Sequence, residues 1–300
     1  MADTKFLDFT ETNAPTPSDY ILISNTSNGV RKTTIEHAVA SADAITDLQD
    51  NAISWGNALV SNHIPRGKDL TSYFDSGEMS TDIANGDFSN IRIGDYIKKS
   101  IVGADDTTYY TVESVVLDCD YIYSINAKNI SKKHHVVMGT NWGGQYMGYA
   151  LHSATDLSGG FVSTDMWKTY IPKIVSKLKA AFGEEHLDTW KEYLSTEISN
   201  DGKVKAYDLY ECQALIPSIG EVTGVPDDYI GDDTKMAYNH CRKLSLMPYY
   251  SGIHPAGYAF WLRSPNGKNK INGLMMKPDG SIASAPASNT TTGYFIFHLI

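Results

Sequence analysis

The most constraining feature of this sequence lies near its end, where an apolar segment typical of a strand is followed by a segment typical of a tight turn. One runs from Phe260 to Pro265, and the other, from Lys277 to Ser281, contains an Asp-Gly turn signal. The first segment places Trp261 and Arg263 in an otherwise apolar run. We expect Trp261 to be buried and Arg263 to pair with a carboxylate or with loop carbonyls. This pattern predicts a compact, loop-rich β domain.

Periodicity predicts a mixture of strands and helices along the rest of the chain. Strands are expected at 20–23, 91–97, 110–117, 121–125 and 135–138. The pair Asn28-Gly29 predicts a hairpin turn, and Thr33 with Glu36 has the capping-box spacing of a helix start. Apolar spacings of three and four predict helices over 167–182, 187–194 and 207–216, with Pro172 at the start or a break of the first. The expected fold class is therefore α+β.

The chain is expected to divide into a small unit at 1–43, a helical linker at 44–66 and a large domain at 67–300. The linker has a heptad-like seam formed by Ile45, Leu48, Ala52, Trp55 and Leu59. Burying this seam among three identical helices would give a homotrimer. Because Gly56 weakens the helix and the run is under three heptads, a single amphipathic helix is the alternative.

Charge and hydropathy exclude several partners. The 35 acidic residues outnumber the 25 basic ones, which gives a net charge of −10 and argues against nucleic acid and anionic membranes as partners. No stretch approaches the roughly 18–20 apolar residues of a membrane span. The start, Met1 to Lys5, lacks the features of a signal peptide. We therefore expect synthesis in the cytoplasm and no membrane insertion.

Reactive and metal-binding residue types form no recognisable constellation. The odd set Cys119, Cys212 and Cys241 predicts buried free thiols rather than disulfides. His134 and His135 are adjacent in an expected strand, so their side chains would point to opposite faces and could not share one ion. The pairs at 227–228 and 232–233 are aspartates that could surround a hard cation, with a solvated loop as the alternative. The sequence thus predicts no metal, no cofactor and no enzymatic activity.

The Trp-Leu-Arg-Ser run at 261–264 and the Asp-Gly-Ser turn at 279–281 resemble the terminal hairpin of a family of uncharacterised function. That family is common in phages and Gram-positive bacteria, and we associate it with the C-type-lectin-like fold. Residues 129–138, 155–166 and 181–187 are similar to further stretches of it, so the likeness spans about 86–300. The chain departs from the family after Gly293, where an apolar run replaces the usual Val-Arg-Pro-Ala. The resemblance implies a C-type-lectin-like domain with twisted antiparallel sheets and inserted helices.

The strand, Asn-Gly turn and Lys-Thr-Thr run between Tyr20 and Glu36 resemble the N-terminal element that joins many phage tail and fibre proteins to the virion. The two resemblances together imply a virion protein of the fibre, baseplate or head-decoration type. It would contact other virion proteins through residues 1–43 and use the large domain to adhere to a glycan or protein of the bacterial surface. One alternative is a purely structural decoration protein without a receptor. A less favoured one is an enzyme of the formylglycine-generating type, which shares the broader fold.

Polar loop tips and glycine-spaced aromatics are the candidate ligand-binding residues, because loops on rigid β scaffolds carry function. The candidates are Trp142, Tyr146, Tyr149, Asn266, Lys268, Asn269, Asn289 and Thr290. The alternative for the aromatics is that they fill the core beneath the loops.

Overall fold

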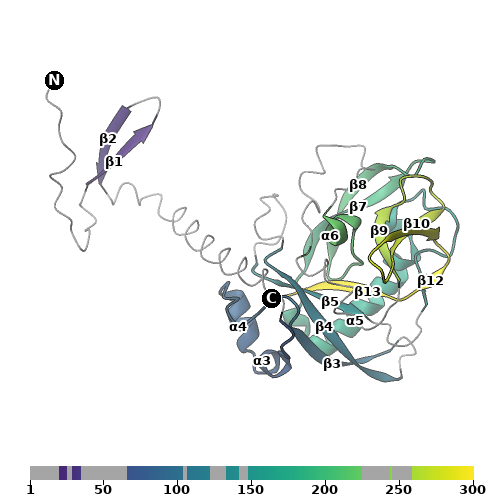
Figure 1. Ribbon diagram of the computed structural model, residues 1–300, viewed down its shortest axis with the longest axis horizontal. Coiled ribbons are helices and arrows are strands. Elements are labelled where there is room, and N and C mark those ends of the chain that lie inside the picture. The colour runs from purple at the N-terminus through teal and green to yellow at the C-terminus, as the bar shows by residue number, and fades with distance from the viewer. Residues whose placement is uncertain are drawn as a thin grey trace. The chain divides into compact units, whose positions relative to one another are not determined.

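The computed structural model describes residues 20–25, 29–34, 66–103, 107–121, 133–141, 148–224, 244 and 259–300 (Figure 1). The chain divides into two units, Met1–Ser54 and Trp55–Ile300. The residues of the predicted trimer seam, Ile45, Leu48, Ala52, Trp55 and Leu59, lie outside the described ranges. So do Trp142, Tyr146 and the aspartate pairs at 227–228 and 232–233.

The first unit contains one antiparallel hairpin, β1 (Tyr20–Asn25) with β2 (Gly29–Thr34). This hairpin confirms the predicted strand and its reversal at the Asn-Gly pair. Thr33 and Thr34 belong to β2, where they pair with Ile21 and Tyr20, and the remainder of the short helix predicted from Thr33 onward lies outside the described residues.

The second unit is built on a four-stranded antiparallel sheet in the order β13-β5-β4-β3. Its strands are β3 (Tyr96–Val102), β4 (Tyr109–Cys119), β5 (Val136–Asn141) and β13 (Tyr294–Leu299). The strands predicted at 110–117 and 135–138 are confirmed. The one predicted at 91–97 begins only at Tyr96, because Gly94 has φ +83° and the buried Asp95 accepts hydrogen bonds from the backbone N–H of Lys68 and Arg92. A turn therefore replaces the first part of that strand.

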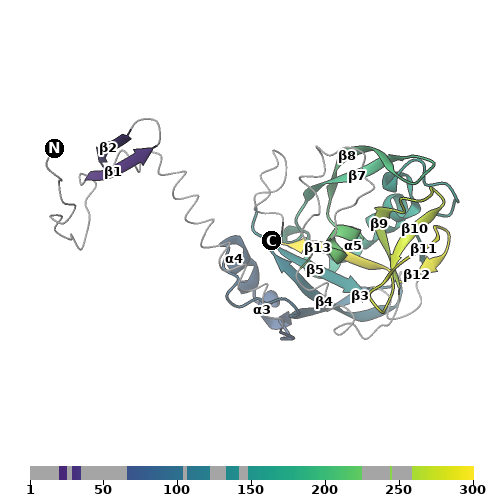
Figure 2. The ribbon, with the colours of Figure 1, turned by 45° about the horizontal axis from the view of Figure 1, so that its top comes forward.

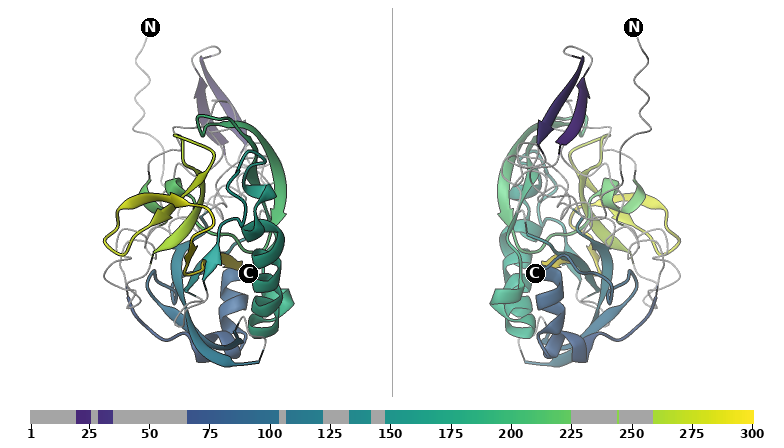
Figure 3. Two further views of the ribbon diagram at one scale, coloured as in Figure 1. Left: turned by 90° about the vertical axis from the view of Figure 1, so that its right-hand side faces the viewer. Right: turned by 90° about the vertical axis from the view of Figure 1, so that its left-hand side faces the viewer.

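Three helices cover one face of this sheet (Figure 3). They are α3 (Thr71–Asp75), α4 (Glu78–Ala84) and α5 (Ile171–Phe182), the last preceded by a π-helical turn, η3 (Met166–Tyr170). The helix predicted at 167–182 is confirmed, and Pro172 stands at the start of α5, where its missing N–H costs nothing. The Phe182 ring lies 5.1 Å from that of Phe297 on β13 and 5.6 Å from that of Phe74 on α3.

The segments predicted as the second and third helices are instead strands of a two-stranded antiparallel hairpin. These are β7 (Trp190–Ile198) and β8 (Val204–Cys212). Trp190, Glu192 and Leu194 alternate inward as a strand requires. Because the middle one of these inward residues, Glu192, is charged, the sequence does not show the alternation of apolar residues that is typical of a strand. The spacing of three and four between Leu187, Trp190 and Leu194 then resembles that of a helix. Cys212 consequently ends a strand and does not lie in a helix.

The C-terminal region forms a three-stranded antiparallel sheet in the order β11-β10-β9 (Figure 2). Its strands are β9 (Phe260–Pro265), β10 (Asn272–Met276) and β11 (Ile282–Pro286). The predicted Asp-Gly turn is confirmed between β10 and β11, where Gly280 has φ +81° and Ser281 donates to Asp279. A short pair, β6 (Tyr149–Ala150) with β12 (Thr290–Thr291), leads the chain back to β13.

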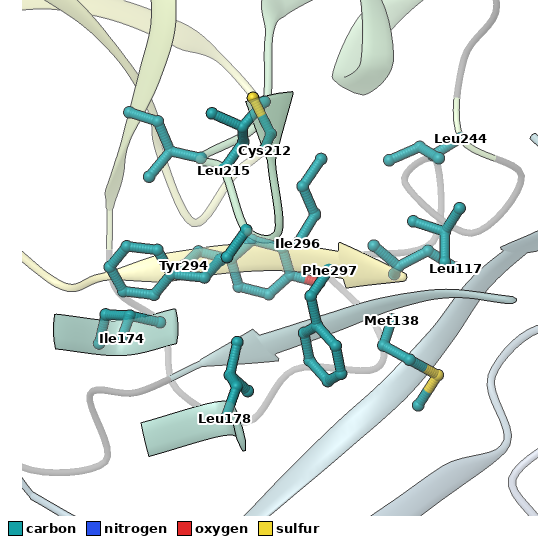
Figure 4. Close-up of a cluster of buried hydrophobic side chains, with 14 of the residues drawn as sticks. Leu117, Met138, Ile174, Leu178, Cys212, Leu215, Leu244, Tyr294, Ile296 and Phe297 are labelled. Atoms are coloured by element: carbon teal, nitrogen blue, oxygen red, sulfur yellow. The ribbon is translucent and has the colours of Figure 1, made fainter. Parts of the chain in front are cut away.

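Strand β13 separates two apolar layers of the core (Figure 4). Phe297 points toward Leu178 of α5, and Ile296 points to the other side, toward Leu215. Backbone hydrogen bonds of 2.9 and 2.7 Å join Leu215 and Ile296 in both directions. The fold is thus α+β with mostly antiparallel sheets, as the sequence predicts, and the β7–β8 hairpin and the C-terminal sheet are carried on one well-packed body.

Candidate functional site

A polar groove of about 400 Å³ opens where the end of the β7–β8 hairpin meets two loops. Its walls come from the loop before η2 (Phe161–Ser163), from β7 and β8 with their connecting turn, and from the segment before β10. The lining residues are Ser158, Gly159, Thr196, Glu197, Ile198, Ser199, Asn200, Lys205 and Lys270. Hydroxyl, amide, ammonium and carboxylate groups therefore meet in one concave surface.

Backbone hydrogen bonds tie the walls of the groove together. The N–H of Leu157 donates to the carbonyl of Lys270 at 2.7 Å, and that of Ile198 donates to Ser158 at 2.8 Å. The loop is held further by Gly160, which has φ +67° and lies so close to Ser195 that an added Cβ would be 2.2 Å from the carbonyl oxygen. The groove is therefore formed by main chain that has little freedom to move.

The β7–β8 turn lies against the loop at 266–270 through Gly202. The N–H of Gly267 donates to the carbonyl of Gly202 at 3.1 Å. Gly202 has φ +81°, and a Cβ there would be 2.6 Å from the backbone nitrogen of Asn269 and 2.7 Å from that of Lys268. Only glycine satisfies both the left-handed conformation and this approach.

Gly202→Ala is expected to destabilise the domain by about 1 kcal/mol from the left-handed backbone and by a further 1–3 kcal/mol or so from crowding against the 266–270 loop. Gly77→Ala is the matched control, because Gly77 has φ +80° but no atom within 4 Å of its added Cβ. Urea unfolding of the two variants isolates the crowding. Equal losses in both would show that the turn and the loop are not in contact.

Charged side chains around the groove are paired one to one. The ammonium of Lys205 lies 3.0 Å from Glu197, that of Lys270 lies 3.4 Å from Asp156, and that of Lys203 lies 3.6 Å from Asp201. Hydrogen bonds from Ser158 hold the pKa of Asp156 below its usual range, and a hydrogen bond from Ser199 does the same for Asp201. All six side chains are substantially exposed, so the pairs contribute little to stability.

The candidate residues of the 266–270 loop differ in their surroundings. Asn266 is buried, and its amide donates to the Ser284 hydroxyl at 2.7 Å. The Asn269 side-chain oxygen accepts from the backbone N–H groups of Ile271 and Asn272 and so shapes the loop. Of these three residues, Lys268 is the one whose side chain is exposed.

The other described candidates lie together at the β6–β12 pair. Thr290 pairs with Ala150, beside Tyr149, and both Asn289 and Thr290 are exposed. Tyr149 is buried, with its ring 5.1 Å from that of Tyr170 and 5.7 Å from that of Phe295, and burial raises its pKa to about 12. The alternative of a core-filling aromatic is thus the correct one for Tyr149.

The structure confirms the predictions for Trp261 and Arg263. Trp261 is buried, and its indole N–H donates to the carbonyl of Tyr149 at 3.0 Å. Arg263 is also buried and forms a two-pronged pair with Glu221, with N–O distances of 2.6 and 2.8 Å, while Glu192 lies 3.9 Å away. Burial lowers the pKa of Arg263, but the two carboxylates raise it by more, so that the group stays charged.

Glu221 has a second task at the start of α6 (Ile219–Thr223). Its side chain accepts from the backbone N–H of Ser218 at 2.7 Å, and the Ser218 hydroxyl accepts from the N–H of Glu221 in return. The Arg263–Glu221–Glu192 cluster therefore joins β9, α6 and β7 at a buried point. We assign it a structural role.

Two histidines and a tryptophan form a buried stack of rings, to which β13 contributes His298 and β7 contributes Trp190. The His298 ring lies 3.9 Å from that of Trp190 and 4.7 Å from that of His135. Burial lowers the pKa of both histidines, that of His298 well below its ordinary value. They are consequently neutral, core-filling groups.

The two described thiols and His134 are also in structural positions, whereas Cys241 lies outside the described residues. Cys119 and Cys212 are free and buried, as predicted, and burial raises the pKa of both thiols. His134 lies 2.8 Å from the buried Asp120, whereas the ring of His135 contacts the carbonyl of Lys133. Among the described residues, no group of three or more histidine, cysteine or acidic side chains is placed to hold a metal ion.

The groove residues of β7 and β8 were not predicted, although the sequence contains a signal for them. Asp201-Gly202 is a hairpin-turn pair between two segments that contain several aromatic and β-branched residues. Reading that pair as a turn would have indicated the hairpin, and with it Thr196, Asn200 and Lys205 near its end.

No helix in the described ranges is both long enough and apolar enough to cross a membrane. Comparison of the chain with family models, with curated proteins and with solved structures found no match.

Proposed function

We propose that this chain is a phage virion protein whose C-terminal part, residues 67–300, is a C-type-lectin-like domain used for adhesion to the bacterial surface. Residues 1–43 would attach it to other virion proteins, and residues 44–66 would assemble three copies. The resemblances at the two ends of the sequence motivate this proposal. The observation that supports recognition is the polar groove, because its hydroxyl, amide and charged groups are presented by loops tied to a rigid β body.

The positions of the reactive side chains favour recognition over catalysis. The two described thiols and the stacked histidines are buried, and the Arg263 cluster is occupied with joining three elements. In the groove itself the carboxylate is Glu197, which is exposed and paired with Lys205. Hydrogen bonding and shape are what these groups can supply to a ligand.

Adhesion by such a groove would depend on several copies acting together. Polar, solvent-exposed sites form hydrogen bonds at the expense of those with water, so one site binds weakly. Three tethered sites raise the effective concentration and lower the rate of release from a surface that repeats its epitope.

The test of this function is binding of the fluorescently labelled full-length chain to intact cells of a broad set of Gram-positive and Gram-negative strains. We expect saturable binding to a small subset of strains. Binding to none, together with failure of particle assembly when the protein is omitted, would instead support the second candidate, a decoration protein without a receptor.

The trimer is tested in the full-length chain by replacing two seam residues, as in the double variant Ile45→Asp and Leu59→Asp. Charged residues cannot be buried in a three-helix seam without a large cost. Sedimentation is expected to give a trimer for the parent chain and a monomer for the variant. A monomeric parent chain would indicate the single amphipathic helix.

A further inference from the structure

The groove lining contains two lysines, Lys205 and Lys270, and one carboxylate, Glu197, and the charges balance once Asp156, the partner of Lys270 outside the lining, is counted. Lys205 and Lys270 are each matched by a carboxylate, Glu197 and Asp156, at 3.0 and 3.4 Å. The neighbouring Lys203 is matched by Asp201. This local balance contrasts with the net charge of −10 for the whole chain.

A balanced groove gives little attraction to an ion of either sign. A site for phosphate or carboxylate groups collects cations in excess, so that the summed field draws the anion in. Here an approaching anion would meet the carboxylate partners of the two lysines, Glu197 in the lining and Asp156 beside it. The acidic surplus of the rest of the surface would repel it further.

The uncharged groups of the groove can both donate and accept hydrogen bonds. The Thr196 hydroxyl and the Asn200 side-chain amide are such groups. The Ser199 hydroxyl already bonds to Asp201 and Lys203, and that of Ser158 bonds to Asp156. A ligand that presents many hydroxyls uses both functions of each group, since a hydroxyl is itself a donor and an acceptor. The lining also includes Gly159 and Ile198, which carry no polar side chain.

We propose that this groove binds a neutral, polyhydroxylated ligand, that is, an uncharged oligosaccharide segment rather than an anionic polymer. This inference rests on the proposed adhesive function and specifies its ligand class. The backbone ties through Leu157, Ile198 and Gly202 keep the groove formed before binding. Preorganisation of this kind lowers the entropic cost of ordering loops around a weakly bound sugar.

The first experiment measures binding of the full-length chain to immobilised neutral probes, maltohexaose and chitohexaose, and to anionic probes, poly(glycerol phosphate) and polygalacturonate. We expect binding to at least one neutral probe, with less than about a twofold change between low and high salt, and weaker binding to both anionic probes. Tighter binding to an anionic probe, or binding to neither neutral probe, would overturn the proposal.

The second experiment blocks the groove. Thr196→Trp places a large ring among the lining residues and is expected to weaken binding of the neutral probe by about tenfold or more. Thr189→Trp is the matched control, since Thr189 is exposed just before β7 and is not part of the lining. Unchanged binding by Thr196→Trp, with the thermal unfolding of both variants unchanged, would contradict the assignment of the site.

The third experiment alters the charge balance without altering shape. The double variant Asp156→Asn and Glu197→Gln removes both negative charges, keeps one oxygen of each group and replaces the other with an NH2 donor. It is expected to bind poly(glycerol phosphate) about fivefold more tightly at low salt, to lose that gain at high salt and to bind the neutral probe as before. If the affinity for poly(glycerol phosphate) at low salt did not change, the charge balance would not decide the ligand class and the proposal would be wrong.

The two proposals fail in different ways. If cells still bind Thr196→Trp as strongly as the parent chain, the groove is not the adhesive site, although adhesion by other loops stands. If no strain binds the parent chain, adhesion fails, whereas binding of a neutral probe that Thr196→Trp abolishes would leave the groove assignment intact.

Discussion

Arg263→Met is expected to destabilise the large domain by about 3–5 kcal/mol, because it leaves two buried carboxylates without their shared cation. Glu221 and Glu192 are each only 3% exposed, and Arg263 also donates to the carbonyl of Ile216 at 2.7 Å. Loss of this size is a large fraction of the roughly 5–15 kcal/mol that stabilises a typical domain. Urea unfolding followed by tryptophan fluorescence measures it.

Three further variants separate the causes. Lys205→Met removes the cation of an exposed pair and is expected to cost less than about 1 kcal/mol. Arg263→Lys keeps the charge but loses the two-pronged geometry. Its loss of stability should therefore lie between those of Lys205→Met and Arg263→Met. Adding Glu221→Gln to Arg263→Met removes one stranded charge and should recover part of the loss. An effect of Arg263→Met no larger than that of Lys205→Met would show that the cluster is not buried.

Acidification is expected to destabilise the domain steeply below about pH 6.5, the ordinary pKa of histidine in an unfolded chain. His135 and His298 are buried and neutral, and their pKa values are lowered in the folded state. The unfolded chain therefore takes up protons first as the pH falls. Above the pKa of histidine in the unfolded chain, the free energy of unfolding is at its full value. As the pH falls from that pKa to the lower pKa of the folded state, each histidine reduces the free energy of unfolding by about 1.4 kcal/mol per pH unit.

The groups that face these histidines modulate the effect without reversing it. His298 stacks on Trp190, and its carbonyl accepts from the N–H of Asp188 at 3.0 Å. Asp120 and Asp188 act to raise the pKa of His135, and Glu221 acts to raise that of His298, but burial outweighs them. Arg263 lowers the pKa of His298 further.

The measurement is the free energy of unfolding in urea at pH 7.5, 6.5 and 5.5. His298→Phe keeps an aromatic ring against Trp190 and removes one titrating group, so its stability should fall about half as steeply with acid as that of the parent chain. Identical slopes for the two proteins would exclude His298 as a source of the acid sensitivity.

Local signals in the sequence were sufficient where neighbouring residues carry the whole pattern. The helix ending at Phe182 follows from its apolar spacing, and Gly183 and Pro172 agree with its limits. The hairpin of β1 and β2 and the turn at Asp279-Gly280 follow from their turn residues. The burial of Trp261 and the pairing of Arg263 followed from an arginine in an apolar run, although its partner Glu221 could not be named.

Local signals failed where a distant residue decides which side chain points inward. Glu192 lies on the buried side of β7 because Arg263, which is distant in the sequence, provides a positive charge 3.9 Å away. In the sequence the same glutamate marks a polar position and makes the segment look like one face of a helix. Asn266 likewise stands among residues typical of an exposed loop tip, yet it is buried and its amide donates to the Ser284 hydroxyl.

The sequence by itself determined the fold class, the main helix, most of the strands of the central sheet and the character of the C-terminal strands, because periodicity and turn chemistry are properties of short segments. Only the tertiary structure decided the β7–β8 hairpin and the groove. Ser158, Thr196 and Lys270 belong to three different segments of the chain. Backbone hydrogen bonds join these segments into the walls of the groove. Such bonds depend on how distant segments meet in space and leave no trace in residue type.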